Sequence, residues 1–168
     1  MKICNGKPLI LNLIDRLSTI KKVRNIVVCT TISQSNDPLV ELLNKENILV
    51  FRGSERDTLN RFLGAAKQFE PDVIINVDGD DIYTDPEYIE LLISKFEDNC
   101  YDFIDMVGFP FGFRSVGFTK NSLEKLCKLK NSIVTDTHYR DFFIKSKLFK
   151  INYFKFNKNI IFPKNLRL

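Results

Sequence analysis

Hydrophobic and polar positions along the chain predict alternating helices and strands. Leu9, Leu13 and Leu17 recur at helical spacing, which indicates an amphipathic helix. Residues 25–31 are instead apolar and β-branched almost throughout, as expected of a buried parallel strand. The same reasoning predicts helices at 8–20, 38–45, 57–69, 86–96, 121–130 and 135–144, and strands at 25–31, 47–51, 73–77, 101–107 and 150–156.

This alternation favours a Rossmann-like three-layer α/β/α fold with a mostly parallel sheet, because parallel strands are joined through helices that cover both faces. The 168 residues, of which 44% are hydrophobic, suffice for one core, so we expect a single domain over 1–168. The stretch 109–113 breaks the regularity. Its residues Phe109, Phe111 and Phe113 alternate as in a strand, which core packing explains better than base stacking.

Carboxylates follow the predicted strand 73–77 directly. Asp78, Asp80 and Asp81 are oxygen ligands suited to Mg²⁺ that carries a nucleotide phosphate, and Gly79 permits a turn between them. The carboxyl ends of strands are also where open α/β sheets bind ligands. The structural alternative is a polar turn before a helix, with Asp85 as N-cap and a proline at the first helical position. Both interpretations can hold together.

Composition limits the partners. The net charge of +4 comes from lysines spread along the chain, which favours a small anionic ligand and lacks the clustered basic stripe of a nucleic-acid binder. The four cysteines are far apart, so neither a zinc site nor a disulfide framework is indicated, and a reducing, cytoplasmic setting is expected. No apolar run reaches the roughly 20 residues of a membrane span, and the start does not read as a signal peptide.

Five motifs, in order, resemble a known family. They are Gly6-Lys7-Pro8-Leu9-Ile10, Val27-Val28-Cys29-Thr30-Thr31, Asp37-Pro38-Leu39-Val40, the stretch 51–62 beginning Phe51-Arg52-Gly53-Ser54, and Gly79-Asp80 before Asp85-Pro86. Together they are similar to the cytidylyltransferases that act on acylneuraminate and Kdo, and within these to the spore-coat polysaccharide synthesis branch.

The resemblance implies a nucleotidyltransferase fold of the nucleotide-diphosphosugar transferase type. It also implies transfer of CMP from CTP, with Mg²⁺, to an acidic sugar, phosphonate or phosphate acceptor for surface glycan synthesis, with release of pyrophosphate. Asp80 matches the family's metal-binding aspartate, whereas Asp78 stands where the family usually has a neutral residue. The family's phosphate-gripping loop and a second metal aspartate would lie outside residues 1–168, so we expect a chain that is incomplete at both ends or a truncated homologue.

The expected nucleotide-binding residues are Lys7, Arg52, Ser54, Asn76 and Asp78, and the expected metal ligands are Asp80 and Asp78. Arg52 leaves a strand end beside Gly53-Ser54 and can contact a nucleotide, although a helix-capping loop with a solvated guanidinium explains it equally well. Lys7 lies just before a helix start, where phosphates find backbone donors, and a solvated lysine is its simpler interpretation.

The expected acceptor-binding residues are Asp81, Arg114, Asp136, His138 and Arg140. Arg114 follows the aromatic stretch and can meet an anion. His138 is the chain's single histidine, and a lone histidine is more often a surface residue than a catalyst. Asp136, His138 and Arg140 lie where enzymes of the resembled family carry acceptor-pocket or dimer-contact residues. Enzymes of that family are usually dimers, so the resemblance also implies a homodimer.

Two other functions fit the same residues. A catalytically inactive homologue that binds nucleotide or a partner would lack the phosphate loop and second aspartate. A glycosyltransferase that uses a nucleotide sugar would explain Asp78-Gly79-Asp80 as a D-x-D motif, but the context of Arg52-Gly53-Ser54 and the helix start at Gly6-Lys7-Pro8 argue against it.

Overall fold

The computed structural model describes residues 2–4, 6–98, 100–110, 112–135 and 138–155. The chain divides into two compact units, each assembled from separate stretches of sequence. The first unit comprises Met1–Arg24, Ile75–Phe118 and Lys150–Leu168, and the second comprises Asn25–Ile74 and Thr119–Phe149. Each unit is described by itself below. The single domain expected from chain length stays a prediction.

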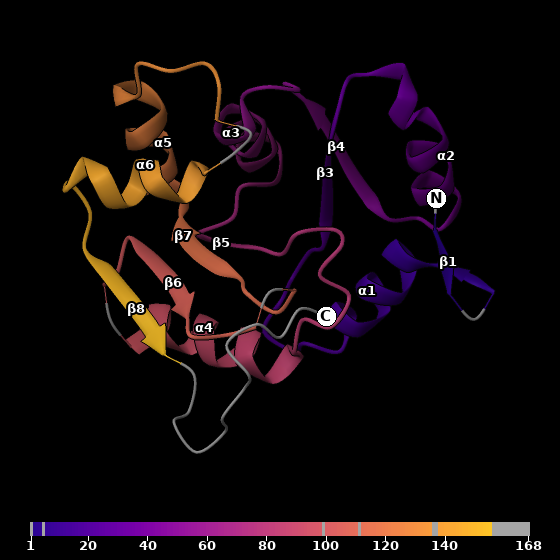
Figure 1. The fold of residues 1–168 in the computed structure, drawn as a ribbon, viewed down its shortest axis with the longest axis horizontal. Helices are drawn as coiled ribbons and strands as arrows, with labels where there is room; N and C mark the ends of the chain where they lie inside the picture. Colours follow the sequence, from indigo (N-terminus) through magenta and orange to yellow (C-terminus); the bar gives the residue numbers. More distant parts are fainter. Residues whose placement is uncertain (1, 5, 99, 111, 136–137, 156–168) are drawn as a thin grey trace. The chain divides into compact units, whose positions relative to one another are not determined.

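The second unit is built on two parallel strands, β3 (Val27–Thr31) and β4 (Leu49–Gly53). Their register places Thr30 opposite Arg52, so both strands end at the same edge. The helices of this unit are α2 (Asp37–Lys45), α3 (Thr58–Phe69), α5 (Lys120–Leu129) and α6 (Tyr139–Ser146), with a 3-10 turn η1 at Gln34–Asn36 (Figure 1). The apolar side chains at its centre are Leu43, Leu59, Leu123, Leu126 and Phe143.

A mixed sheet, most of whose residues belong to the first unit, has the order β5 (Val73–Asn76), β7 (Val116–Thr119), β6 (Phe103–Val107) and β8 (Ile151–Lys155). Strand β5 enters from the second unit and β7 leaves toward it. Helix α4 (Pro86–Asp98) contributes Leu92 to a core with Ile104 and Met106 of β6. Strand β6 pairs in parallel with β8 and antiparallel with β7.

The chain begins with a small antiparallel hairpin, β1 (Ile3–Cys4) with β2 (Lys7–Pro8), followed by α1 (Leu9–Ser18). A helix from Pro8 was expected, and Pro8 instead ends β2 and is the residue that precedes the first helical position of α1. The amphipathic pattern nevertheless predicted the helix itself correctly, because Leu11 and Leu13 are buried.

The structure differs from the sequence interpretation at β7, at residues 109–113 and at the start of α6. Strand β7 was not expected, because the glycine in its middle weakens a strand signal. Residues 109–113 form no strand where described, since Gly108 and Gly112 adopt positive φ of 81° and 90° and turn the chain. Phe109 still packs on the Leu92 core as expected, and Phe111 lies outside the described residues.

Helix α6 begins at Tyr139, four residues later than expected. His138 adopts a left-handed conformation with φ of 63°, which is incompatible with a helix interior, and Thr135 is engaged at the start of another helix. The other predicted helices and strands are present with ends shifted by at most two residues. Within the described ranges, helices long and apolar enough for a membrane crossing are absent.

Candidate functional site

The turn that follows β5 exposes two of its three carboxylates. Asp78 and Asp80 are exposed, and Asp81 is half-buried. Backbone hydrogen bonds shape the turn, because Asp81 N donates to Asp78 O at 3.0 Å and Ile82 N donates to Asp80 O at 2.9 Å. These two local hydrogen bonds shape the backbone that carries the exposed carboxylate of Asp80.

Asn76 and Asp78 contact each other across this turn. The Asn76 side-chain amide donates to Oδ1 of Asp78 at 3.0 Å. The amide therefore orients one of the two carboxylates, and it does so from the last residue of β5. The structure thus brings Asn76, Asp78, Asp80 and Asp81 into one short segment.

The next residues fasten the turn to its helix. Thr84 is buried and donates both its N–H and its hydroxyl to Asp81 O, at 3.0 and 2.9 Å. Arg16 of α1 donates to Thr84 O at 2.7 Å. Asp85 Oδ1 accepts from Glu87 N at 3.0 Å, so Asp85 caps α4 as predicted, with Pro86 first in the helix. The structural interpretation therefore applies to Thr84 and Asp85, and the carboxylates before them stay candidate ligands.

Gly79 has no structural reason to be glycine. Its φ lies outside the left-handed region, and a Cβ placed there would meet only Ile10 Cδ1, at an ordinary 3.6 Å. In contrast, a Cβ at Gly117 would lie 2.5 Å from the ring of Phe96. A glycine that neither conformation nor packing requires leaves the backbone between Asp78 and Asp80 open to close approach.

The donor set suits Mg²⁺ that arrives with phosphates. Such an ion takes one or two protein carboxylates and completes its shell with phosphate oxygens and water. Asp80 and Asp78 supply that number of exposed oxygen ligands. No group of three or more His, Cys, Asp or Glu side chains in the described part of the chain is arranged as a metal cage.

Lys7 belongs to the first unit and lies in β2. Its amine forms an ion pair with Asp15 of α1, and its carbonyl accepts a long hydrogen bond of 3.4 Å from the Asn12 side chain. This ion pair is part-exposed and so adds little to stability. Lys7 therefore keeps the position expected of it, before α1, with its charge partly satisfied.

Arg52 belongs to the second unit and lies where β3 and β4 end together. Its guanidinium donates to Thr31 O at 3.2 Å and to Ser33 O at 3.0 Å, and it pairs with Asp37 Oδ1 at 2.8 Å. These contacts join the end of β3 to the start of α2. The guanidinium is thus engaged by protein groups, which differs from the solvated guanidinium of the structural alternative, and it lies at the sheet edge where open α/β folds bind ligands.

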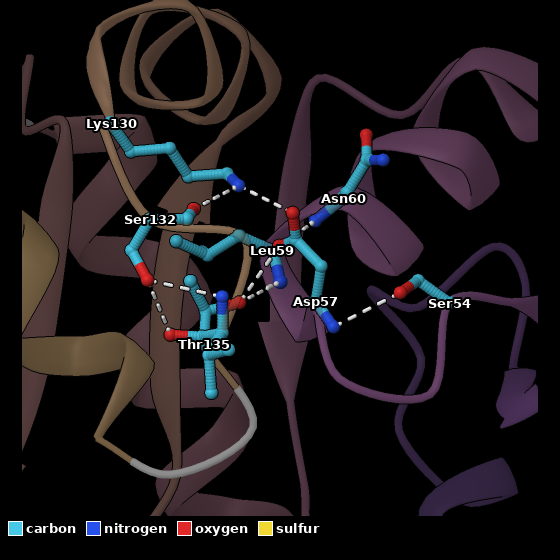
Figure 2. Close-up of polar contacts among 8 residues, drawn as sticks. Ser54, Asp57, Leu59, Asn60, Lys130, Ser132 and Thr135 are labelled. Atoms are coloured by element: carbon cyan, nitrogen blue, oxygen red, sulfur yellow. Dashed lines mark hydrogen bonds and ion pairs between the residues drawn. The ribbon is translucent and has the colours of Figure 1, made fainter.

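Ser54 starts a buried polar cluster that the sequence did not reveal. Its hydroxyl accepts from Asp57 N at 3.0 Å, and Asp57 Oδ1 in turn accepts from Asn60 N at 3.1 Å and from the Thr135 hydroxyl at 2.8 Å (Figure 2). The other oxygen of Asp57 forms an ion pair with Lys130, whose amine also donates to Ser132 O at 2.8 Å. Nothing in the pattern of the sequence links residue 57 to residues 130 and 135.

The ion pair between Asp57 and Lys130 is withdrawn from solvent, with side chains 9% and 7% exposed. Burial by itself would raise the pKa of Asp57. The hydrogen bonds from Lys130, Asn60 N and Thr135 outweigh burial and hold the pKa of Asp57 below its usual value of 3.8. Asp57 is therefore an ionised anchor at neutral pH and is unsuited to accept a proton in catalysis.

Arg114 lies in the first unit and is engaged by a buried carboxylate. Its Nε and Nη2 donate to the two oxygens of Asp105, at 3.2 and 2.5 Å, and the Asp105 side chain is 2% exposed. The bidentate pair holds the chain after the aromatic stretch onto β6. Arg114 is thus required for charge balance inside this unit, a role that its position beside the aromatic stretch did not indicate.

The remaining acceptor candidates lie at the start of α6 in the second unit. His138 is exposed and precedes the helix, and Asp141 N donates to its carbonyl at 2.8 Å. Arg140 is half-buried in the first turn. Asp136 lies outside the described residues. Because Asp78, Asp80, Asp81 and Arg114 belong to the first unit, each set of candidates is grouped only within its own unit.

The two less exposed cysteines are unsuited to nucleophilic chemistry. Burial raises the pKa of Cys29 and that of Cys127 to about 11, against a usual 9.0. Both thiols therefore remain protonated at neutral pH, and a thiol, unlike a thiolate, is a poor nucleophile and metal ligand.

Comparisons with known proteins agree with this fold. Residues 1–166 match the family model described as cytidylyltransferase. An uncharacterized protein of Methanocaldococcus jannaschii is 34% identical over 142 residues, 84% of this chain and 58% of that protein. The spore coat polysaccharide biosynthesis protein SpsF of Bacillus subtilis is 33% identical over 88 residues, 52% of this chain and 37% of that protein. The chain thus spans between about a third and three fifths of these curated relatives.

Solved structures of known proteins also match this fold. A cytidylyltransferase from Leptospira borgpetersenii superposes with a TM-score of 0.83 at 27% identity, covering 94% of this chain and 68% of that one. A CMP:2-keto-3-deoxy-manno-octonic acid synthetase complexed with CTP superposes with a TM-score of 0.73 at 13% identity, covering 92% and 81%, and at that identity it supports the fold alone. The fold is thus the Rossmann-like α/β fold of nucleotidyltransferases, and this chain belongs to the cytidylyltransferase family.

Proposed function

We propose that the protein transfers CMP from CTP to an acidic sugar, phosphonate or phosphate acceptor, with release of pyrophosphate. The observation that carries this proposal is the exposed pair Asp78 and Asp80 on either side of an unconstrained glycine, at the end of β5, in a chain of the cytidylyltransferase family. The relation to the spore coat polysaccharide protein supports a role in surface glycan synthesis.

The reaction is an in-line displacement. An oxygen of the acceptor forms a bond to the α-phosphorus of CTP, the bond from that phosphorus to the bridging oxygen breaks, and pyrophosphate leaves with the electron pair. A carboxylate, phosphate or phosphonate acceptor attacks as the anion, whereas a hydroxyl acceptor must also lose its proton to solvent or a base. Catalysis of this type depends mainly on positioning and on neutralising phosphate charge.

In this scheme the residues of the chain bind the metal ion and both substrates and hold them in position. Asp80, with Asp78 beside it, holds Mg²⁺, which when bound neutralises charge on the phosphates. Asn76 orients Asp78, and the backbone at Gly79 admits the nucleotide closely. We also propose that Lys7, Arg52 and Ser54 contribute to nucleotide binding, and that Asp81, Arg114, Asp136, His138 and Arg140 contribute to acceptor binding. We further propose that the protein acts as a homodimer in the cytoplasm.

The test is pyrophosphate release from the protein with CTP, Mg²⁺ and a panel of acidic sugars, phosphonates and sugar phosphates. Release that requires CTP, Mg²⁺ and one acceptor supports the proposal, and ATP, GTP and UTP serve as nucleotide controls. Binding of CTP in calorimetry without release for any acceptor would instead identify an inactive, nucleotide-binding homologue. Release of nucleoside diphosphate from a nucleotide sugar would identify a glycosyltransferase.

A further inference from the structure

The N-terminus of α3 is capped by two side chains from distant parts of the second unit. Asp57 Oδ1 accepts from Asn60 N at 3.1 Å, as an N-cap residue does. Thr135 Oγ1 accepts from Leu59 N at 3.0 Å, although it lies 76 positions further along the chain. The same hydroxyl donates to Asp57 Oδ1 at 2.8 Å, so the two caps also bind each other (Figure 2).

The backbone of Thr135 fastens the turn before the helix. Thr135 N donates to Arg56 O at 2.8 Å, within the stretch that joins β4 to α3. Thr135 is fully buried, and Lys130 adds its ion pair to Asp57 from the same distant segment. Buried hydrogen bonds of this kind resist exchange with water, so Lys130 and Thr135, which are distant in sequence, fix the geometry of the turn 54–57.

The turn 54–57 contains one proposed nucleotide-binding residue, Ser54. Ser54 Oγ accepts from Asp57 N at 3.0 Å, and Ser54 O accepts from Arg61 at 2.5 Å. Arg52 lies two residues earlier, at the end of β4. A shift of Asp57 therefore displaces Ser54 directly through a hydrogen bond.

We infer that Thr135 is a positioning residue for the nucleotide: by holding Asp57 and Arg56 it fixes the turn that presents Ser54, and it thereby sets the affinity for CTP. This inference rests on the proposed function. Thr135 itself contacts neither nucleotide nor metal, and its effect passes through the cluster of Asp57, Lys130 and Ser54.

The experiment compares wild-type protein with Thr135→Val, which keeps shape but loses the hydroxyl, and with Thr135→Ser, which keeps the hydroxyl. Ser132→Ala is the matched control, because the Ser132 hydroxyl contacts only Val134 among the partners described, within the same loop. Titration calorimetry with CTP and Mg²⁺ gives the Kd. Hydrogen exchange of the Leu59 and Asn60 amides reports the state of the turn without any ligand.

Thr135→Val is expected to weaken CTP binding by about fivefold or more, while Thr135→Ser and Ser132→Ala stay within about twofold of wild type. The Leu59 amide should exchange faster in Thr135→Val alone. If Thr135→Val does not fold, Thr135→Cys replaces it, because a thiol makes weaker hydrogen bonds of the same kind.

Thr135→Val protein that melts at a lower temperature yet binds CTP as wild type does would show a purely structural role and overturn the inference. That result leaves the proposed function standing. Wild-type protein that does not bind CTP overturns the proposed function and the inference together, and the two failures are therefore distinguishable.

Discussion

The hydroxyl of Thr135 lies 2.8 Å from Oδ1 of Asp57, although 78 positions separate the two residues in sequence. Through this contact a loop residue completes the cap of a helix in another part of the chain. The capping of this helix start is thus supplied partly by tertiary structure.

Replacing Asp80 by asparagine should abolish Mg²⁺-dependent pyrophosphate release and leave the fold intact. The carboxylate is exposed, so its loss removes a metal ligand without exposing a core. Glu87→Gln, an exposed change at the start of α4, is the control and should keep full activity. Wild-type rates in Asp80→Asn would exclude Asp80 from the mechanism.

Removal of Asp57 should cost much more stability than loss of an exposed acid. Asp57→Ala leaves the Lys130 amine buried without its counter-ion, which costs about 3 kcal/mol or more. Asp141→Ala, which breaks an exposed pair with Lys145, should cost under about 1 kcal/mol. Urea denaturation of both variants measures the difference, and equal losses would mean that the buried pair contributes no more than the exposed one.

The same carboxylate predicts a dependence of stability on pH. The pKa of Asp57 is lower in the folded protein than its usual 3.8, so the folded state binds fewer protons than the unfolded state near that pH. The contribution of the Asp57 carboxylate to the free energy of unfolding is complete above about pH 5, and it is lost as the pH falls through the pKa of the folded state. The gap in unfolding free energy between wild type and Asp57→Asn should therefore be constant from neutral pH to about pH 5 and shrink below about pH 4. A gap that does not change down to pH 2 would contradict this.

Arg114→Ala should destabilise the protein by about 3 kcal/mol, because it leaves the Asp105 carboxylate buried and unpaired. The double variant Asp105→Asn with Arg114→Ala should recover part of that loss, since no buried charge remains. Arg24→Ala, at an exposed arginine, is the control and should change stability little. Chemical denaturation distinguishes these cases, and full stability in Arg114→Ala would refute a structural role for the pair.

Two glycines should respond oppositely to alanine. A methyl group at Gly79 meets only Ile10 at 3.6 Å, so Gly79→Ala should keep its melting temperature but lose activity if the nucleotide approaches the backbone there. A methyl group at Gly117 would lie 2.5 Å from Phe96, so Gly117→Ala should lower stability by about 1–3 kcal/mol. Full activity in Gly79→Ala would remove the backbone from the proposed site.

Local pattern predicted most of the elements, because each helix carries an apolar face and each predicted strand an apolar run. It failed where distant contacts decide the structure. Strand β7 is stable because Phe96 and Ile75 fill the space beside Gly117, which no local window contains. Helix α6 begins later than expected because the Thr135 side chain accepts a hydrogen bond from Leu59 N at the start of α3. The carboxylates after β5 could be proposed as ligands from the sequence because they follow a strand directly, whereas the partners of Arg114 and Asp57 lie on other elements.

The interleaving of the two units has a consequence for synthesis on the ribosome. Helix α3 packs with α5 and takes one of its caps from Thr135, so residues 57–69 emerge long before the groups that complete them. Until residue 135 has been translated, the Leu59 amide must be satisfied by water and the Asp57 carboxylate lacks Lys130. The nascent helix is therefore incomplete through the addition of 76 residues, and translation beyond that point supplies the missing contacts.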